Sequence, residues 1–246
     1  TFDIGTYDLT VTGVLYNSDN IKLDGSNVSV YFGTFDIDSG TVNYTGTSGG
    51  TLLSSISIYY DLEISGEGVW YSVAGDTLDI DNNLTIGSSI TLDLEDEDLL
   101  LSENLINNGT LKFEGSQVVS IVTPDTDSGT IIYDGSTDTS IIIDDISAYY
   151  DLEFNNSSGT WEASTNMVVY SDLNIADGTF DIGSYDLTLT GGFINSDTFK
   201  LEGVSGQNIS KIDTDSGTID YTGTSGGTLL SSMSDDSQYY DLVLSG

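Results

Sequence analysis

Paired aspartates recur three times in this 246-residue chain, and each pair is followed by Ser and Gly. The pairs are Asp36/Asp38, Asp125/Asp127 and Asp213/Asp215. Alternate residues of an extended segment point the same way, and the glycine permits a sharp turn, so two carboxylates can face one calcium ion. No pair matches the EF-hand loop or the nonapeptide calcium repeat. Two interpretations stay open: a calcium site, or an acidic turn that faces solvent.

The charge balance excludes several classes of function. There are 40 Asp and Glu residues against four Lys, and the net charge is −36. Such a chain has no cationic surface for nucleic acid or for anionic lipid. It also lacks His, Cys and Arg, which supply most catalytic triads, thiol nucleophiles and oxyanion clamps. We therefore expect no enzyme, and no cofactor other than calcium.

Two further absences limit the options. Without Cys the chain forms no disulfide. It also has no run of 18 apolar residues, so we expect no membrane insertion. The chain begins at Thr1 inside a repeated motif, which predicts that it is a segment of a longer protein.

Internal repetition organises the whole chain. Residues 1–13 recur almost unchanged at 179–191, and a diverged copy begins at Thr91. The tetrapeptide Tyr-Tyr-Asp-Leu recurs at intervals of 90 residues, at Tyr59, Tyr149 and Tyr239. These intervals define three repeats, of which the last is incomplete: residues 1–90, 91–178 and 179–246.

Each repeat divides into short segments of roughly 14–22 residues with alternating apolar and polar side chains, as in Phe2/Ile4 and Ile21/Leu23. This alternation is typical of β-strands, and the Gly, Asn, Asp and Ser between them are typical of turns. The segments are too short to close a domain, and only Pro124 interrupts them. The pattern predicts an all-β fold, a parallel β-helix (β-solenoid) that runs continuously through residues 1–246. Tandem β-sandwich domains are the alternative.

The segment length also predicts the dimensions of such a solenoid. We expect roughly 14 coils, which at a strand spacing of about 4.8 Å form a rod roughly 65 Å long.

Lys and Tyr also occupy fixed repeat positions. Lys22, Lys112 and Lys200 share one position, and we expect them to point outward and neutralise acidic side chains of neighbouring coils. In each Tyr-Tyr pair we expect one ring to pack inward and the other outward.

Several segments resemble the coils of a known group of proteins. They are residues 81–87 (DNNLTIG), 105–115 (LINNGTLKFEG) and 176–183 (ADGTFDIG). They are similar to the coils of large secreted prokaryotic adhesins and filament proteins of the filamentous-haemagglutinin type. The resemblance implies a right-handed parallel β-helix, export to the cell surface, and a structural or adhesive role. It assigns no catalytic residue.

These observations predict a structural protein. We expect a subunit or shaft segment of an extracellular filament, sheath or surface fibre. Its partners are copies of itself, or further repeats of a longer chain, stacked head to tail. The alternative is an adhesin stalk that binds glycans or calcium-bridged partners.

Overall fold

The computed structural model describes residues 1–25, 29–136, 141–143, 146–204, 207–209, 212–213, 215–224, 227, 229–230 and 239–246. It divides into two compact units: unit 1 comprises Thr1–Lys112 and Gln117–Gly129, and unit 2 comprises Phe113–Ser116 and Thr130–Gly246. The described residues contain no helix. The strands stack in parallel as a β-solenoid of about 11 turns, which confirms the predicted fold class. The hand of the solenoid and its continuity through 1–246 stay predictions.

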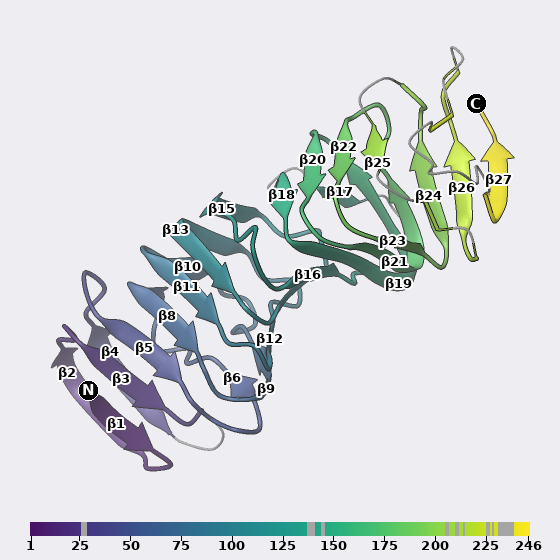
Figure 1. Ribbon diagram of the computed structural model, residues 1–246. Coiled ribbons are helices and arrows are strands. Elements are labelled where there is room, and N and C mark those ends of the chain that lie inside the picture. Colours follow the sequence, from purple (N-terminus) through teal and green to yellow (C-terminus); the bar gives the residue numbers. More distant parts are fainter. Residues whose placement is uncertain are drawn as a thin grey trace. The chain divides into compact units, whose positions relative to one another are not determined.

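Unit 1 has three rows of stacked strands, which the chain visits in turn (Figure 1). Row 1 comprises β1 (Phe2–Gly5), β3 (Asn20–Leu23), β5 (Thr41–Tyr44), β8 (Asp61–Ile64), β11 (Asn83–Ile86) and the end of β13 (Leu99–Asn107). Row 2 comprises β6 (Gly50–Thr51), β9 (Gly68–Tyr71), β12 (Ile90–Asp93) and β14 (Thr110–Phe113). Row 3 comprises β7 (Ile58–Tyr59), β10 (Leu78–Ile80), the start of β13 and β15 (Val119–Thr123). A separate pair consists of β2 (Leu9–Leu15) and β4 (Val30–Phe35).

Unit 2 also has three rows. Row 4 comprises β16 (Thr130–Tyr133), the start of β19 (Asp151–Ala163), the start of β21 (Leu173–Asp181) and β23 (Phe193–Asn195). Row 5 comprises β17 (Ile141–Ile143), the ends of β19 and β21, β24 (Thr198–Leu201), β26 (Thr218–Tyr221) and β27 (Asp241–Leu244). Row 6 comprises β18 (Ala148–Tyr149), β20 (Met167–Val169), β22 (Leu187–Leu189) and β25 (Asn208–Ile209).

Each coil is longer than many of the segments seen in the sequence. Partners along row 1 are 19 to 22 residues apart, at Phe2, Ile21, Val42, Leu62, Leu84 and Leu105. The expected number of roughly 14 coils was therefore too high, and the structure has about 11 turns. The reason is that one coil contains strands of several rows, so a single strand segment is shorter than a coil.

The 88–90-residue repeat does not contain a whole number of coils. In unit 1, Phe2 of the first repeat lies in row 1, whereas its counterpart Leu92 in the second repeat lies in row 2. In unit 2, Ile131 of the second repeat lies in row 4, and its counterpart Ile219 in the third lies in row 5. At 19–22 residues per coil, one repeat makes about four and a third turns. Equivalent residues of successive repeats therefore face different sides and do not stack.

Inward side chains of neighbouring coils form a continuous core in each unit. In unit 2 the ring of Phe154 stacks on Phe180 at a centroid distance of 4.3 Å and on Tyr133 at 5.7 Å. Trp161 is fully buried beside Phe154, and its indole Nε1 donates to the carbonyl of Glu114, 3.4 Å away. Because one ring contacts the coils above and below it, the core couples neighbouring coils.

The repeated tyrosines and lysines occupy both inward and outward positions. Tyr59 and Tyr149 are buried and Tyr60 and Tyr150 are partly exposed, which confirms the expectation for these two pairs. In the third pair, Tyr239 is partly exposed and Tyr240 is exposed. Of the lysines, Lys112 pairs with the carboxylate of a neighbouring coil, as described below.

Replacing the central ring of the core tests its contribution. We expect Phe154→Ala to lower the free energy of unfolding by about 3–5 kcal/mol, because a large cavity opens between coils. The control is Val122→Ala, which truncates a side chain that is 65% exposed and should change stability by less than about 0.5 kcal/mol. Urea denaturation followed by circular dichroism measures both. Equal effects would contradict the proposed core.

Candidate functional site: the aspartate corners

The six aspartates predicted to bind metal lie at three corners of the solenoid. In each pair the first residue (Asp36, Asp125, Asp213) is partly buried, and the second (Asp38, Asp127, Asp215) is exposed. Each corner packs against the preceding coil, 18 or 19 residues earlier. The corners thus share one local geometry.

The first aspartate of each pair joins two coils. One carboxylate oxygen of Asp125 accepts the backbone amide of Asn107 at 2.7 Å, and the other accepts the amide of Asp127 at 3.0 Å. The corresponding distances are 3.2 and 3.3 Å at Asp36, and 2.9 and 3.1 Å at Asp213. Hydrogen bonds from amides to a charged acceptor are stronger than neutral ones, so this carboxylate anchors the turn to its neighbour.

The Ser and Gly that complete the motif also contact the preceding coil. The hydroxyl of Ser128 donates to the carbonyl oxygen of Asn107 at 3.0 Å, and the other two serines repeat this contact at the same distance. Gly129 has a φ of 74°, and an added Cβ would lie 2.2 Å from the same carbonyl oxygen. Only glycine combines this backbone conformation with so close an approach.

Sequence reasoning missed the residue on which each corner packs. It is a buried asparagine, only 1–5% exposed: Asn17, Asn107 or Asn195. The side-chain amides of Asn17 and Asn195 donate to the carbonyls of Thr41 and Thr218, which begin the strand after the corner. These asparagines are 90 and 88 residues apart, so the repeat spacing carried a signal that could have found them.

Two of the aspartate pairs have opposed pKa shifts. A hydrogen bond with Asp38 holds the pKa of Asp36 below its ordinary value, while the same hydrogen bond and the charge of Asp36 raise the pKa of Asp38. Burial works against ionisation of Asp213, but hydrogen bonds from Asp215, Asn195 and Ser216 outweigh it and lower its pKa. The pKa of Asp215 is raised by the hydrogen bond and charge of Asp213. The second aspartate therefore ionises at a cost to the folded state.

The two corners of unit 1 pack on different residues and do not form one site. Within unit 1, the first corner packs on Asn17, in the loop before β3, and the second on Asn107, the last residue of β13. Among the described residues, no group of three or more acidic side chains is arranged to hold a metal ion. Each corner supplies two carboxylates, of which one already accepts backbone amides. Calcium binding at these corners stays a prediction.

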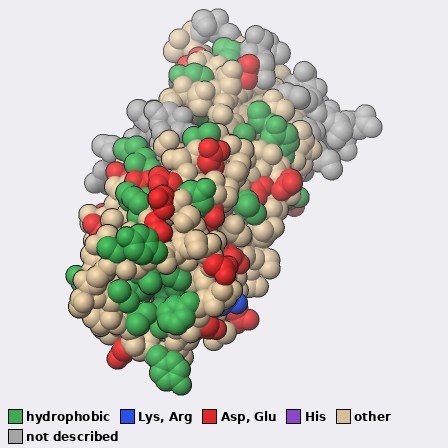
Figure 2. Space-filling model, turned by 90° about the vertical axis from the view of Figure 1, so that its left-hand side faces the viewer, with side chains coloured by type: hydrophobic (Ala, Val, Ile, Leu, Met, Phe, Trp, Pro, Cys, Tyr) green, Lys and Arg blue, Asp and Glu red, His purple; other side chains and the backbone are tan. Residues whose placement is uncertain are grey.

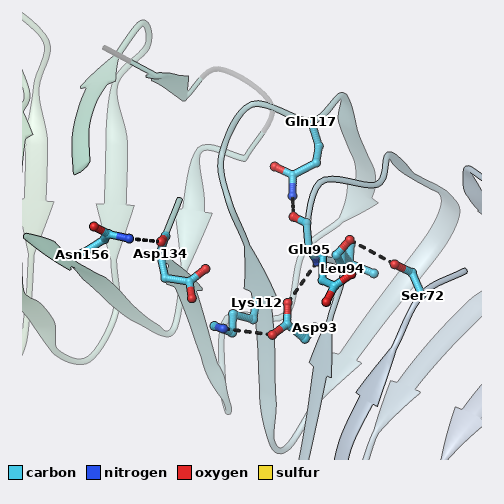
Figure 3. A network of polar contacts seen from close by, with 8 residues as sticks. All are labelled: Ser72, Asp93, Leu94, Glu95, Lys112, Gln117, Asp134 and Asn156. Atoms are coloured by element: carbon cyan, nitrogen blue, oxygen red, sulfur yellow. Dashed lines mark hydrogen bonds and ion pairs between the residues drawn. The ribbon is translucent and has the colours of Figure 1, made fainter. Parts of the chain in front are cut away.

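The densest acidic run, residues 93–98, is used in a similar way (Figure 3). Asp93 is 8% exposed, accepts the amide of Glu95 at 3.0 Å and forms an ion pair of 2.9 Å with Lys112 on the next coil. Asp98 accepts the amide of Val118 at 2.8 Å. The ion pair confirms, at Lys112, the expectation that lysine neutralises an acid of a neighbouring coil.

Aspartates hold backbone amides of neighbouring coils throughout both units. The donors lie 19 to 22 residues away, in the pairs Ser29 to Asp8, Asn83 to Asp61, Asp172 to Asp151, Gly192 to Asp172 and Gly178 to Asp197. Corner amides have no partner in the strand ladders, and a carboxylate satisfies them strongly. The acidic composition is thus explained in part by how coils are joined.

Neither the face drawn in Figure 2 nor comparison with known proteins indicates a ligand for the aspartate corners. In Figure 2, acidic side chains are scattered among hydrophobic and other side chains and do not form one patch. No helix within the described ranges is long and apolar enough to cross a membrane. Comparison of the chain with known protein families, curated proteins and solved structures finds no match.

A glycine substitution tests the corner. We expect Gly129→Ala to lower the free energy of unfolding by at least about 2 kcal/mol, because the backbone conformation and the Asn107 carbonyl both oppose a Cβ. Gly13→Ala is the matched control, since no heavy atom lies within 4 Å of its added Cβ. Urea midpoints of the two variants give the comparison. If Gly129→Ala leaves the free energy of unfolding unchanged, the close contact with the Asn107 carbonyl is absent.

The opposed pKa shifts predict a pH-dependent effect of Asp38→Asn. The raised pKa of Asp38 means that its ionisation destabilises the folded state at neutral pH, and this cost disappears as pH falls below the unfolded value of about 3.8. The variant should therefore be more stable than the parent at pH 7, with the difference fading towards pH 3. Thermal melts across this range measure it. If added calcium stabilises the parent at pH 7 but not the variant, this corner binds calcium.

Proposed function

We propose that this chain is a shaft segment of an extracellular filament, sheath or surface fibre, and that it is not an enzyme. The observation that carries the proposal is the use of the repeated motif: each of the three Asp-x-Asp-Ser-Gly corners joins its coil to the preceding one. Stability in such a fold sums contacts between neighbouring coils, so length can be added without a new core. A motif whose side chains bond neighbouring coils to one another suits a load-bearing role.

The offset between repeat and coil supports the same role. Because equivalent residues of successive repeats fall in different rows, one repeat's acidic corner does not stack on the next. Like charges are therefore spread around the solenoid, which limits repulsion between coils and keeps a net charge of −36 compatible with folding. The high net negative charge also disfavours lateral association of fibres.

In the proposed shaft, further coils stack head to tail on an outer strand. Phe2 on β1 is 52% exposed, whereas its row partner Ile21 is 3% exposed. Leu244 on β27 is 69% exposed, whereas its partner Tyr221 is 6% exposed. A further coil, from the same chain or from another copy placed head to tail, covers such a row and pairs its free backbone edge.

An adhesin stalk is the second candidate. Tyr7 and Tyr16 are 78% and 80% exposed, and exposed tyrosine rings can stack on the apolar face of a sugar. In this alternative the shaft carries glycan-binding or calcium-bridged contacts at the cell surface. A glycan array separates the two functions: binding that is lost in Tyr16→Ser favours the stalk, and no binding favours the plain shaft.

Length measurement tests the shaft directly. Chains with three and six repeats, imaged by electron microscopy, should form stiff rods that differ by about 21 Å per added repeat, since about four and a third coils stack at roughly 4.8 Å each. Beads of constant size joined by linkers would contradict the proposal. Antibody labelling of intact and permeabilised source cells then tests location: a surface fibre is labelled without permeabilisation.

A further inference from the structure

A cavity of about 300 Å³ opens at one corner of unit 1, away from the aspartate corners. It lies between residues 52–57, which precede β7 in one coil, and residues 73–78, which lead into β10 in the next. The first loop is held by the amide of Leu53, which donates to the buried hydroxyl of Tyr44 at 2.9 Å. The second is held by Ser72, whose hydroxyl donates to the carbonyl of Leu94 at 3.0 Å. Both walls are thus anchored to the core.

The cavity has an apolar floor and a polar rim. Leu52, Ile56, Tyr59 and Leu78 line it although each is only 2–6% exposed. Around them lie exposed polar residues: Ser54, Ser57, Asp76 and Thr77. This is the usual composition of a small-molecule site, and the volume is at the lower end of the range for such sites.

The charge at the rim restricts what can bind. Asp76 is the only charged residue among those that line the cavity, and its carboxylate has no hydrogen bond or ion pair within the described part of unit 1. The nearby amide of Gly75 is already bonded to Glu97, a second negative group. An anion would be repelled here, whereas a cationic head group would pair with Asp76.

The loop that forms the rim is longer in this repeat than in the next. Seven residues lie between Trp70 and Leu78, the first residue of β10. Only five lie between the equivalent Trp161 and Met167, the first residue of β20. The first repeat thus has two extra residues at the corner that carries Asp76.

We propose that this cavity is a binding site for a small organic cation: an apolar body of about the size of one aromatic ring, with a primary ammonium group that pairs with Asp76. The apolar body rests on Leu52, Ile56 and Leu78, and the ammonium group lies at the rim. The site is independent of the shaft function, because none of its residues belongs to an aspartate corner.

Benzylammonium is the probe, and methyl NMR of the whole chain is the measurement. Titration should shift the methyl signals that line the cavity, those of Leu52, Leu53, Ile56, Val73 and Leu78, and leave distant methyl signals unchanged. Benzoate should cause no shift. Methylammonium, which lacks the apolar body, should also cause none.

Two variants and two matched controls complete the test. Asp76→Asn should weaken benzylammonium binding about two- to fivefold, the range for one exposed ion pair, and Ser54→Trp should abolish it by filling the mouth. Glu103→Gln and Ser120→Trp change exposed residues elsewhere in unit 1 and should leave binding unchanged. The proposal is overturned if benzylammonium shifts no cavity methyl signal, or if benzoate binds equally well. Equal binding by the parent and Asp76→Asn would likewise overturn the cationic assignment.

Discussion

Parallel pairing between coils is the constraint on which the rest of this structure depends. Once a strand pairs in register with the strand one turn earlier, each turn must contain nearly the same number of residues, here 19 to 22 along row 1. Loops can vary at the corners, but the ladders cannot slip without moving apolar side chains outward. The core, the corners and the placement of every repeated motif follow from this period.

Carboxylates accept hydrogen bonds from backbone amides that have no strand partner at the corners. Each corner interrupts the ladder and leaves backbone amides without a strand partner, and a buried amide without a partner is costly. The carboxylate of Asp125 accepts hydrogen bonds from the amide of Asp127 in its own turn and from the amide of Asn107 one coil earlier. Repeating the solution at many corners accumulates negative charge, and the four lysines offset only a tenth of the 40 acids. The remaining charge is tolerable because most of it faces solvent.

The fold class could be predicted because the alternation of apolar and polar residues and the internal repetition both extend along the whole sequence. Alternation in segments such as Ile21/Leu23 predicts strands, and repetition predicts stacking. The number of coils was harder to predict, because the sequence does not distinguish a β-turn between two strands of one coil from a β-turn that leads into the next coil. The corners were harder still. Two aspartates separated by one residue suit a metal ion and an amide clamp equally well, and the partner, Asn107, resembles any turn asparagine until its burial is known.

The mismatch between repeat and coil also allows one corner loop to lengthen while the strand ladders stay in register. The two residues added between Trp70 and Leu78 stay within one corner, and the strands on both sides keep their register with the next coil. Ser72 holds the loop to that coil at the point where it leaves the ladder. Because repeats turn by a third of a coil relative to one another, an extension in one repeat meets no copy of itself directly above. Corner loops can therefore diverge one at a time while the strand ladders remain the same.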